Sequence, residues 1–116
     1  HLTQSFNRHG ILLSGASLDR HTKEEIPSQG VFFGVIQVPY NGQPILLAAE
    51  CQSTGGYPRI AIVPQAEVWK LIHLKPHDTI QFQQITLNEA KKRLQRQNAY
   101  LNHLRTYLLP THYPTL

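Results

Sequence analysis

The sequence predicts an α+β domain that is mainly β, a small β-barrel with one short helix, followed by a long C-terminal helix. Three observations support this class. The β-rich runs are short and punctuated by glycine, an Asn-Gly turn separates two of them, and a capping signal precedes leucines at helical spacing. We expect the barrel to occupy residues 1–85 and the helix with its tail to occupy residues 86–116.

The expected strands alternate with polar turns. β-rich, apolar or alternating runs predict strands at residues 10–15, 31–39, 44–51, 60–63 and 79–85. Residues 16–30 are polar and rich in turn formers, so they predict a loop. Asn41 and Gly42 suit a two-residue hairpin turn, because both residue types tolerate positive φ.

Two helices are expected towards the C-terminus. Residues 65–74 predict a short helix, which Lys75 and Pro76 end. Thr86-x-x-Glu89 is a capping box for a long helix that Pro110 ends. Its apolar residues recur at three- and four-residue spacings, once Gln97 is given a place in the series: Leu87, Ala90, Leu94, Leu101, Leu104 and Leu108. We expect this leucine face to pack on the barrel or on another chain, and the chain to self-associate if the face is left uncovered.

Composition narrows the function classes. The 116 residues fit one domain, and 41% hydrophobic with 16% charged residues indicates a folded core. The net charge is +4, and much of the positive charge lies in one helical segment, Lys91 to Arg96. This patch alone is weak evidence for binding nucleic acid, so we expect no nucleic-acid partner. Without a long apolar run or a signal-like start, we expect no membrane partner and a cytoplasmic location, in keeping with the single cysteine, Cys51.

Several kinds of site are not expected. The seven histidines are scattered and have no cysteine nearby, so we expect no metal site. No phosphate-loop motif occurs, so we expect no nucleotide or other cofactor to be bound by this chain. Cys51 could be a nucleophile only beside a positioned histidine, and an inert half-buried thiol is the alternative.

Polar turns are the places where a binding site is expected. Arg8, near a strand end, can hold a carboxylate or phosphate, or it is an ordinary surface arginine. Gln37 is polar within a β-rich run, and it is either buried and hydrogen-bonded or turned to solvent. In residues 50–59, the backbone N–H groups near Gly55 and Gly56 suit an oxyanion or carboxylate, although a tight turn with satisfied side chains is the alternative.

Five motifs together resemble those of a known family. They are I-Q-V-P-x-N-G-Q-P-I-L-L at residues 36–47, G-G-Y-P-R-I-A at 55–61, N-R-x-G at 7–10, L-K-P-x-D-x-I-x-F at 74–82 and T-L-x-E-A at 86–90. Their order and spacing agree until about Leu94. The family is named for allophanate hydrolase subunit 2, and it includes the third subunit of bacterial 5-oxoprolinase, the Kip-antagonist-type proteins and half of the carboxyltransferase domain of urea carboxylase.

The resemblance implies a cyclophilin-like β-barrel and a site that is shared between two related subunits. Family members have about the size of two domains, and this chain resembles the C-terminal one, so we expect it to be a piece of a longer protein. That expectation agrees with the absence of a starting methionine. The chain departs from the family at Phe6, His9, Gln29 and Glu50, where serine, methionine, glutamate and aspartate are usual.

Two functions follow from the resemblance. The first is part of a subunit of ATP-dependent 5-oxoprolinase, or of a related urea amidolyase or allophanate hydrolase, in which ATP is used by the assembled enzyme and this chain alone is inactive. Its partners would be a homologous subunit (allophanate hydrolase subunit 1 or the B-type subunit of 5-oxoprolinase) and a third, ATPase-type subunit. The alternative is a non-catalytic regulatory module of the Kip-antagonist type.

The resemblance and the polar turns together give a set of candidate site residues. The expected catalytic residues are Glu50, Gln52 and Tyr57. The expected substrate-binding residues are Asn7, Arg8, Gln37, Asn41, Thr54, Gly55, Gly56 and Arg59. Because the turns of a small barrel can gather at one end, we expect these residues to converge on one concave surface.

Overall fold

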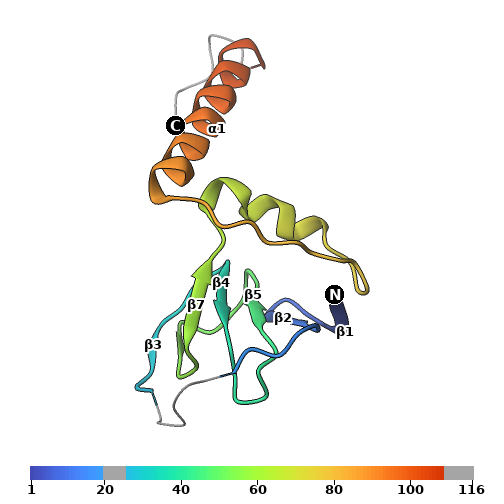
Figure 1. Ribbon diagram of the computed structural model, residues 1–116. Coiled ribbons are helices and arrows are strands. Elements are labelled where there is room, and N and C mark those ends of the chain that lie inside the picture. Colours follow the sequence, from blue (N-terminus) through green and yellow to red (C-terminus); the bar gives the residue numbers. More distant parts are fainter. Residues whose placement is uncertain (20–25, 109–116) are drawn as a thin grey trace. The chain divides into compact units, whose positions relative to one another are not determined.

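The computed structural model describes residues 1–19 and 26–108, with residues 3–6 described by their backbone alone. The chain divides into two compact units, His1–Phe82 and Gln83–Leu116, which are treated separately below. All strands and the short helix belong to the first unit, and the long helix belongs to the second (Figure 1).

The first unit contains two antiparallel sheets. The larger one has five strands in the spatial order β1 (Leu2–Phe6), β2 (Gly10–Leu13), β5 (Ile45–Leu47), β4 (Val35–Gln37) and β7 (Arg59–Ile62). The smaller one pairs β3 (Gln29–Gly30) with β6 (Thr54–Gly55). Strands and two helices together agree with the α+β class, although the described helices hold more residues than the strands, so the fold is not mainly β. All residues of β7 are exposed at one edge of the larger sheet.

The closed barrel is not formed by the described residues, because the five-stranded sheet ends at β1 and β7 without joining them. The predicted strand at residues 79–85 is also wrong, since this segment belongs to no ladder. The backbone beside β1 is bonded to it at His77 and Asp78, just before this segment. The Asp78 carbonyl oxygen accepts a hydrogen bond from the Leu2 amide at 2.8 Å. Alternation of apolar and polar residues predicts an extended segment with two different faces, but it does not supply a neighbouring strand.

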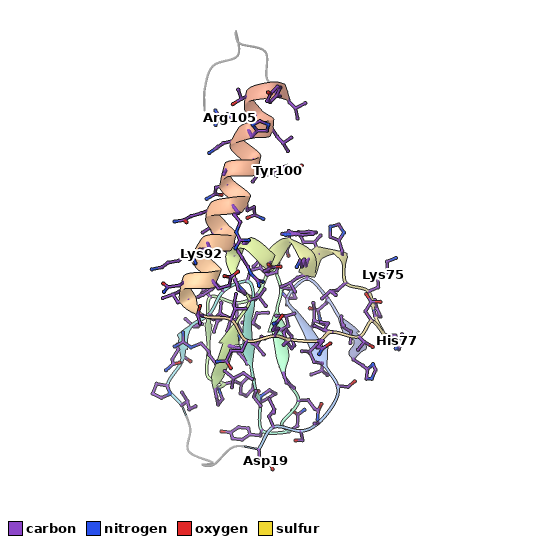
Figure 2. All side chains as sticks on the ribbon, turned by 45° about the horizontal axis from the view of Figure 1, so that its top comes forward. Asp19, Lys75, His77, Lys92, Tyr100 and Arg105 are labelled. Carbon is purple, nitrogen blue, oxygen red and sulfur yellow. The ribbon has the colours of Figure 1, made fainter. Side chains whose placement is uncertain are left out.

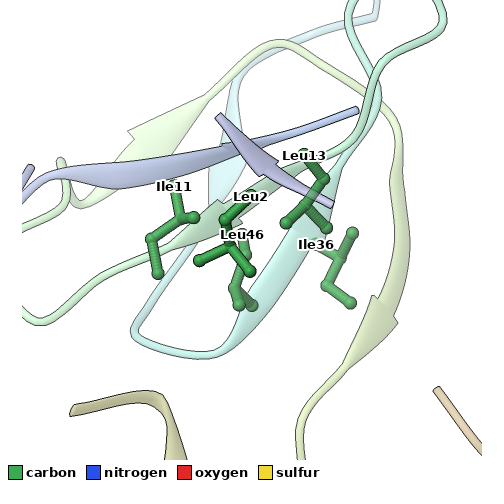
Figure 3. Packing of buried hydrophobic residues seen from close by; sticks show 5 residues of the cluster. All are labelled: Leu2, Ile11, Leu13, Ile36 and Leu46. Carbon is green, nitrogen blue, oxygen red and sulfur yellow. The ribbon is translucent and has the colours of Figure 1, made fainter. Parts of the chain in front are cut away.

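Apolar side chains pack on both faces of the larger sheet. One cluster consists of Leu2, Ile11, Leu13, Ile36 and Leu46 (Figure 3). It is covered by partly buried residues from the short helix and the segments around it: Val63, Leu71, Leu74 and Ile80. The other cluster consists of Val31, Val35 and Leu47, with Ile45 and Cys51 at its margin. Because strand side chains alternate, Ile36 faces the first cluster while its neighbours Val35 and Gln37 face the second side.

The hairpin between β4 and β5 is confirmed by their antiparallel pairing, in which Ile36 lies opposite Leu46. The two-residue turn expected within it is wrong. Gly42 has a φ of 76°, but Asn41 is outside the left-handed region. The turn instead closes from Pro39 to Gly42, whose amide donates to the Pro39 carbonyl oxygen at 3.0 Å. The Asn41 side chain accepts a hydrogen bond from the Gln43 amide at 3.0 Å, so its polar group stabilises the turn locally.

Both expected helices are present. The short one is a 3₁₀-helix, η1 (Gln65–His73), and the long one is α1 (Leu87–Leu108). Thr86 Oγ1 accepts a hydrogen bond from the Glu89 amide at 3.1 Å, which is one half of the predicted capping box. The Glu89 carboxylate instead accepts from Arg93 Nε at 3.1 Å and from Arg96 Nη2 at 3.3 Å. Hydrogen bonding to Arg93 is the main cause that lowers the pKa of Glu89.

The side chains of α1 are not packed into a core. Lys92, Tyr100 and Arg105 extend away from the helix axis (Figure 2), and no residue of α1 is buried. Leu94 and Leu104 are half-buried and Leu101 is exposed. Packing of the leucine face on the first unit or on another chain therefore stays a prediction.

His77 occupies an unusual backbone conformation in the turn after η1. Its φ is 71°, in the left-handed region, and it follows Pro76. The Asp78 amide donates to the Lys75 carbonyl oxygen at 3.1 Å, and Asp78 Oδ2 accepts from the Lys75 amide at 2.8 Å. This arrangement fits a type II turn, which favours glycine at the third position.

We expect Gly42→Val to destabilise the first unit by at least about 1–2 kcal/mol, because the side chain must adopt a left-handed backbone. A Cβ at this position would also overlap Ser17 Oγ and lie 2.9 Å from the Leu18 carbonyl oxygen. The matched control is Gly15→Val, because a Cβ at Gly15 meets nothing within 4 Å. Urea unfolding measures both variants, and equal losses of stability would contradict this account of the turn.

We expect His77→Gly to stabilise the first unit by about 0.5–1 kcal/mol, since glycine removes the left-handed strain but adds freedom to the unfolded chain. His77→Asn should give a smaller gain, and His77→Val a loss, because asparagine tolerates this region and β-branched residues do not. Melting temperatures of the three variants test the order. A lower melting temperature for His77→Gly than for the parent chain would show that the His77 side chain stabilises the turn.

Candidate functional site

Gln37 is the one buried polar residue among the described residues, and it lies at the end of β4. Only 2% of its surface is exposed. Its Nε2 has no hydrogen-bond partner within the described part of the chain. Leaving a buried polar group without a partner costs about 1–3 kcal/mol, so this amide is unfavourable for the stability of the isolated fold. Of the two alternatives from the sequence, burial is correct and the hydrogen bond to Nε2 is not seen.

Gly55 lies directly against this amide, and the Gln52 side chain also lies close to Gly55. A Cβ added at Gly55 would lie 2.5 Å from Gln37 Nε2 and 3.4 Å from Gln52 Nε2. The glycine is therefore required by close approach, because any larger residue would displace the Gln37 carboxamide. Gly55 is buried, whereas Gln52 is exposed. Both carboxamides therefore lie close to Gly55 of β6, the first covered and the second open to solvent.

A bulge in strand β7 brings Arg59 opposite Gln37. Val35 pairs with Ile62 and Ile36 with Ala61, but Gln37 pairs with Arg59, so Ile60 is an extra residue. Such bulges change the direction in which a strand presents its side chains. Arg59 Nη1 donates a hydrogen bond to the Gly30 carbonyl oxygen at 2.9 Å. The guanidinium of Arg59 is therefore bonded to strand β3, on the partner strand of Gly55.

The other candidate residues from the turns make contacts of their own. Thr54 is exposed and pairs with Gly30 across the small sheet. The rings of Tyr57 and Tyr40 meet edge to face, with their centres 6.4 Å apart. A Cβ at Gly56 would be 3.5 Å from the Ile26 carbonyl oxygen. Asn41 is used in its own turn, and its carbonyl oxygen accepts from Ser17 Oγ at 3.5 Å.

Arg8 and Glu50 form a second group at the β1–β2 turn. Arg8 Nε lies 3.2 Å from Glu50 Oε2, with 73% and 59% of these side chains exposed. Asn7 Oδ1 accepts from the His9 amide at 2.8 Å, and His9 Nδ1 lies 2.7 Å from the Glu50 carbonyl oxygen. The Arg8 guanidinium is therefore engaged by a carboxylate of the same chain, and a ligand carboxylate would have to compete with Glu50. Exposed ion pairs of this kind contribute little to stability, so replacing Glu50 by a ligand carboxylate at Arg8 would cost little free energy.

The predicted residues thus form two groups. Gln37, Gln52, Gly55 and Arg59 are brought together by β4, β6 and β7, whereas Asn7, Arg8 and Glu50 share hydrogen bonds at another turn. Among the hydrogen bonds and ion pairs of the described residues, none joins Arg8 or Glu50 to Gln37. The sequence did not single out Gly30, because it acts through its backbone carbonyl, which any residue type could supply.

Other features of the described residues bear on the site. A shallow depression of about 160 Å³, lined by Leu13, Pro44, Phe82 and their neighbours, contains none of the candidate residues. Residues 1–19 and 26–108 hold no cluster of three potential metal ligands among His, Cys, Asp and Glu. Neither described helix combines the length and apolar character needed to cross a membrane.

Comparison with known proteins identifies relatives over most of the chain. The chain is 44% identical over 103 residues to the C subunit of 5-oxoprolinase from Escherichia coli (strain K12), covering 89% of this chain and 33% of that protein. It is 38% identical over 104 residues to the C subunit of 5-oxoprolinase from Haemophilus influenzae, covering 90% and 34%. It is also 35% identical over 69 residues to urea amidolyase of Lachancea kluyveri, covering 60% of this chain and 4% of that protein.

The chain therefore spans about a third of the length of the two 5-oxoprolinase relatives, which share 33% and 34% of their length with it. Residues 1–84, which include every strand and the candidate site, match the family described as "Carboxyltransferase domain, subdomain A and B". On this match and these identities, the chain belongs to the carboxyltransferase-domain family, subdomains A and B.

Proposed function

We propose that this chain is part of a subunit of a 5-oxoprolinase-type hydrolase, which opens the lactam ring of 5-oxoproline to give glutamate. The observation that carries the proposal is the 44% identity to the C subunit of a 5-oxoprolinase over 89% of this chain. The relative named urea amidolyase supports the same reaction type, because that name also describes cleavage of an amide-type C–N bond. Hydrolysis in the assembled enzyme is proposed to use ATP, and we propose that this chain does not itself bind the nucleotide.

The chemistry of the candidate site suits a lactam. Ring opening places negative charge on the carbonyl oxygen in the transition state, and N–H donors directed at that oxygen stabilise it. Gln37 and Gln52 are neutral donors beside Gly55, and they can bind a lactam without adding competing charge. Arg59 or Arg8 provides the cation for the substrate carboxylate, since a guanidinium binds a carboxylate through two parallel hydrogen bonds.

The remaining candidate residues of both groups are also proposed to take part in binding or catalysis. Glu50, Gln52 and Tyr57 are proposed as catalytic residues. Glu50 is the only carboxylate among the candidates, and it is paired with Arg8 at 3.2 Å. A general base needs a free carboxylate, so a substrate that binds Arg8 would also release Glu50 for proton transfer. Asn41, Thr54 and Gly56 are proposed to bind substrate from the turns nearby.

The site is proposed to be completed by other chains. The partners are a homologous subunit of the 5-oxoprolinase B type and an ATPase-type subunit, and the isolated chain is proposed to be inactive because it holds only part of a shared site. A cyclophilin-like fold is proposed for residues 1–85. The leucine face of α1 is a candidate contact for a partner or a second copy, and the proposed location is the cytoplasm.

We expect Gln52→Ala and Arg59→Ala to reduce kcat/KM for 5-oxoproline in an assembly reconstituted with the partner subunits. Loss of a neutral hydrogen bond costs about 0.5–1.5 kcal/mol and loss of a charged one about 1.5–3 kcal/mol. These energies correspond to reductions of roughly 2- to 10-fold for Gln52→Ala and roughly 10- to 100-fold for Arg59→Ala. Glutamate release at varied 5-oxoproline and saturating ATP measures both.

Gln81→Ala is the control, because Gln81 is exposed and lies outside the candidate site. Parental turnover in both Gln52→Ala and Arg59→Ala would contradict the site assignment. An unmodified assembly that releases no glutamate from 5-oxoproline would contradict the function itself.

A further inference from the structure

We propose that the Gln37 carboxamide is a covered binding site for an acceptor oxygen of a small ligand, and that strands β3 and β6 form a cover that opens to admit it. The ligand class is a compact molecule with an amide or carbonyl oxygen at one end and a carboxylate at the other. The inference rests on the proposed function, for which it names the atom that receives the lactam oxygen.

The buried amide is the first part of the argument. Gln37 follows Val35 on the face of the sheet that also carries Val31 and Leu47, all of them buried. An apolar side chain would suit this setting, yet the position holds an amide with a donor that lacks a partner among the described residues. Buried polar groups are satisfied in most folded proteins, so an acceptor from outside this chain accounts for the donor.

The cover is the second part. Gly55 of β6 lies so close to Gln37 Nε2 that a Cβ would approach to 2.5 Å, and this contact closes the amide off from solvent. The sheet that carries Gly55 is small, with two residues in each strand, and Gln29, Gly30 and Thr54 are all exposed. Two-stranded pairs of this length are marginally stable, so β3 and β6 can separate from Gln37 without unfolding the larger sheet.

Arg59 connects the cover to the strand that pairs with β4. Arg59 Nη1 donates a hydrogen bond to the Gly30 carbonyl oxygen at 2.9 Å. The positively charged guanidinium therefore keeps β3, and with it the cover, in place through an uncharged carbonyl group. A carboxylate is a stronger acceptor for a guanidinium than a carbonyl group is, because both partners are then charged. A ligand carboxylate at Arg59 therefore displaces Gly30 and releases the cover.

The spacing of the two residues sets the size of the ligand. Gln37 and Arg59 lie opposite each other on adjacent antiparallel strands, where Cα atoms are roughly 4.5–5.5 Å apart. One ligand can then place a carboxylate on Arg59 and a carbonyl oxygen on Gln37 when these groups are separated by only a few bonds. A five-membered lactam with a carboxylate on the ring meets this requirement.

The test follows the side-chain NH₂ signals of Gln37 by NMR in the ¹⁵N-labelled chain, assigned by their loss in Gln37→Met. The probes are 5-oxoproline, 2-pyrrolidinone, which has the lactam alone, and glutarate, which lacks the lactam. We expect 5-oxoproline to shift the Gln37 signals with saturation, and the other two probes to bind at least tenfold more weakly. The amide signals of Gly30 and Gly55 should shift in the same titration, because the cover moves.

Two variants separate binding from structure. Gln37→Met keeps the length of the side chain and removes the donor, so it should lose saturable binding of 5-oxoproline while its melting temperature stays unchanged or rises. Gln81→Met replaces an exposed glutamine and should bind as the parent chain does. A clear fall in the melting temperature of Gln37→Met would show that the amide has a structural partner and would overturn the proposal.

The remaining outcomes distinguish this inference from the proposed function. Gln37 signals that do not respond to any probe overturn the covered site, as does parental turnover of 5-oxoproline by an assembly carrying Gln37→Met. In that second case the 5-oxoprolinase function stands. If the unmodified assembly fails to turn over 5-oxoproline, a saturable response of Gln37 to one of the probes still supports the covered site.

Discussion

The pairing of β4 with its two neighbours is the constraint on which the first unit depends. β4 is only three residues long, and all three are buried between β5 and β7. Ile36 packs in one apolar cluster and Val35 in the other, while Gln37 places its amide beside Gly55. Because successive side chains point to opposite faces, a shift of one residue in this register would exchange the two clusters and remove the amide from the candidate site.

Two local exceptions to regular structure make the site possible. The extra residue Ile60 allows Arg59 to lie opposite Gln37, and the missing side chain at Gly55 allows β6 to approach the Gln37 amide. Regular strands would be more stable by themselves, because bulges interrupt ladder pairing and glycine has greater freedom in the unfolded chain. The core holds the sheet in place, and these exceptions position polar groups at its end.

The sequence was informative where a local pattern determines the structure. The apolar runs flanking Asn41-Gly42 predicted the β4–β5 hairpin, and the Thr86 cap predicted where α1 begins. Strand β1 was missed because its interior residues, Thr3, Gln4 and Ser5, are polar and resemble a loop. Residues 79–85 were assigned to a strand because they alternate, although alternation cannot reveal whether a partner strand is adjacent.

The residues of the candidate site could be predicted from the sequence, but which of them lie close together could not. Glycines and polar side chains at the turns identified Gln37, Gln52, Gly55 and Arg59, but their contacts depend on a bulge and on a backbone carbonyl. Neither the bulge in β7 nor the role of the Gly30 carbonyl can be recognised from the types of residues involved. The pairing of Arg8 with Glu50 was not foreseen for the same reason, since it depends on how the β1–β2 turn lies against the segment after β5.

The exposed edge at β7 makes this chain prone to associate with other molecules in concentrated solution. Ile60 and Ile62 are 52% and 56% exposed on a strand with no neighbour on its outer side in the described sheet. An edge of this kind acts as a template for strands of other molecules, so it favours aggregation by strand pairing. A lysine at Ile60, which lies on the bulge, would discourage such stacking while it leaves the pairing of Ile36 with Ala61 intact.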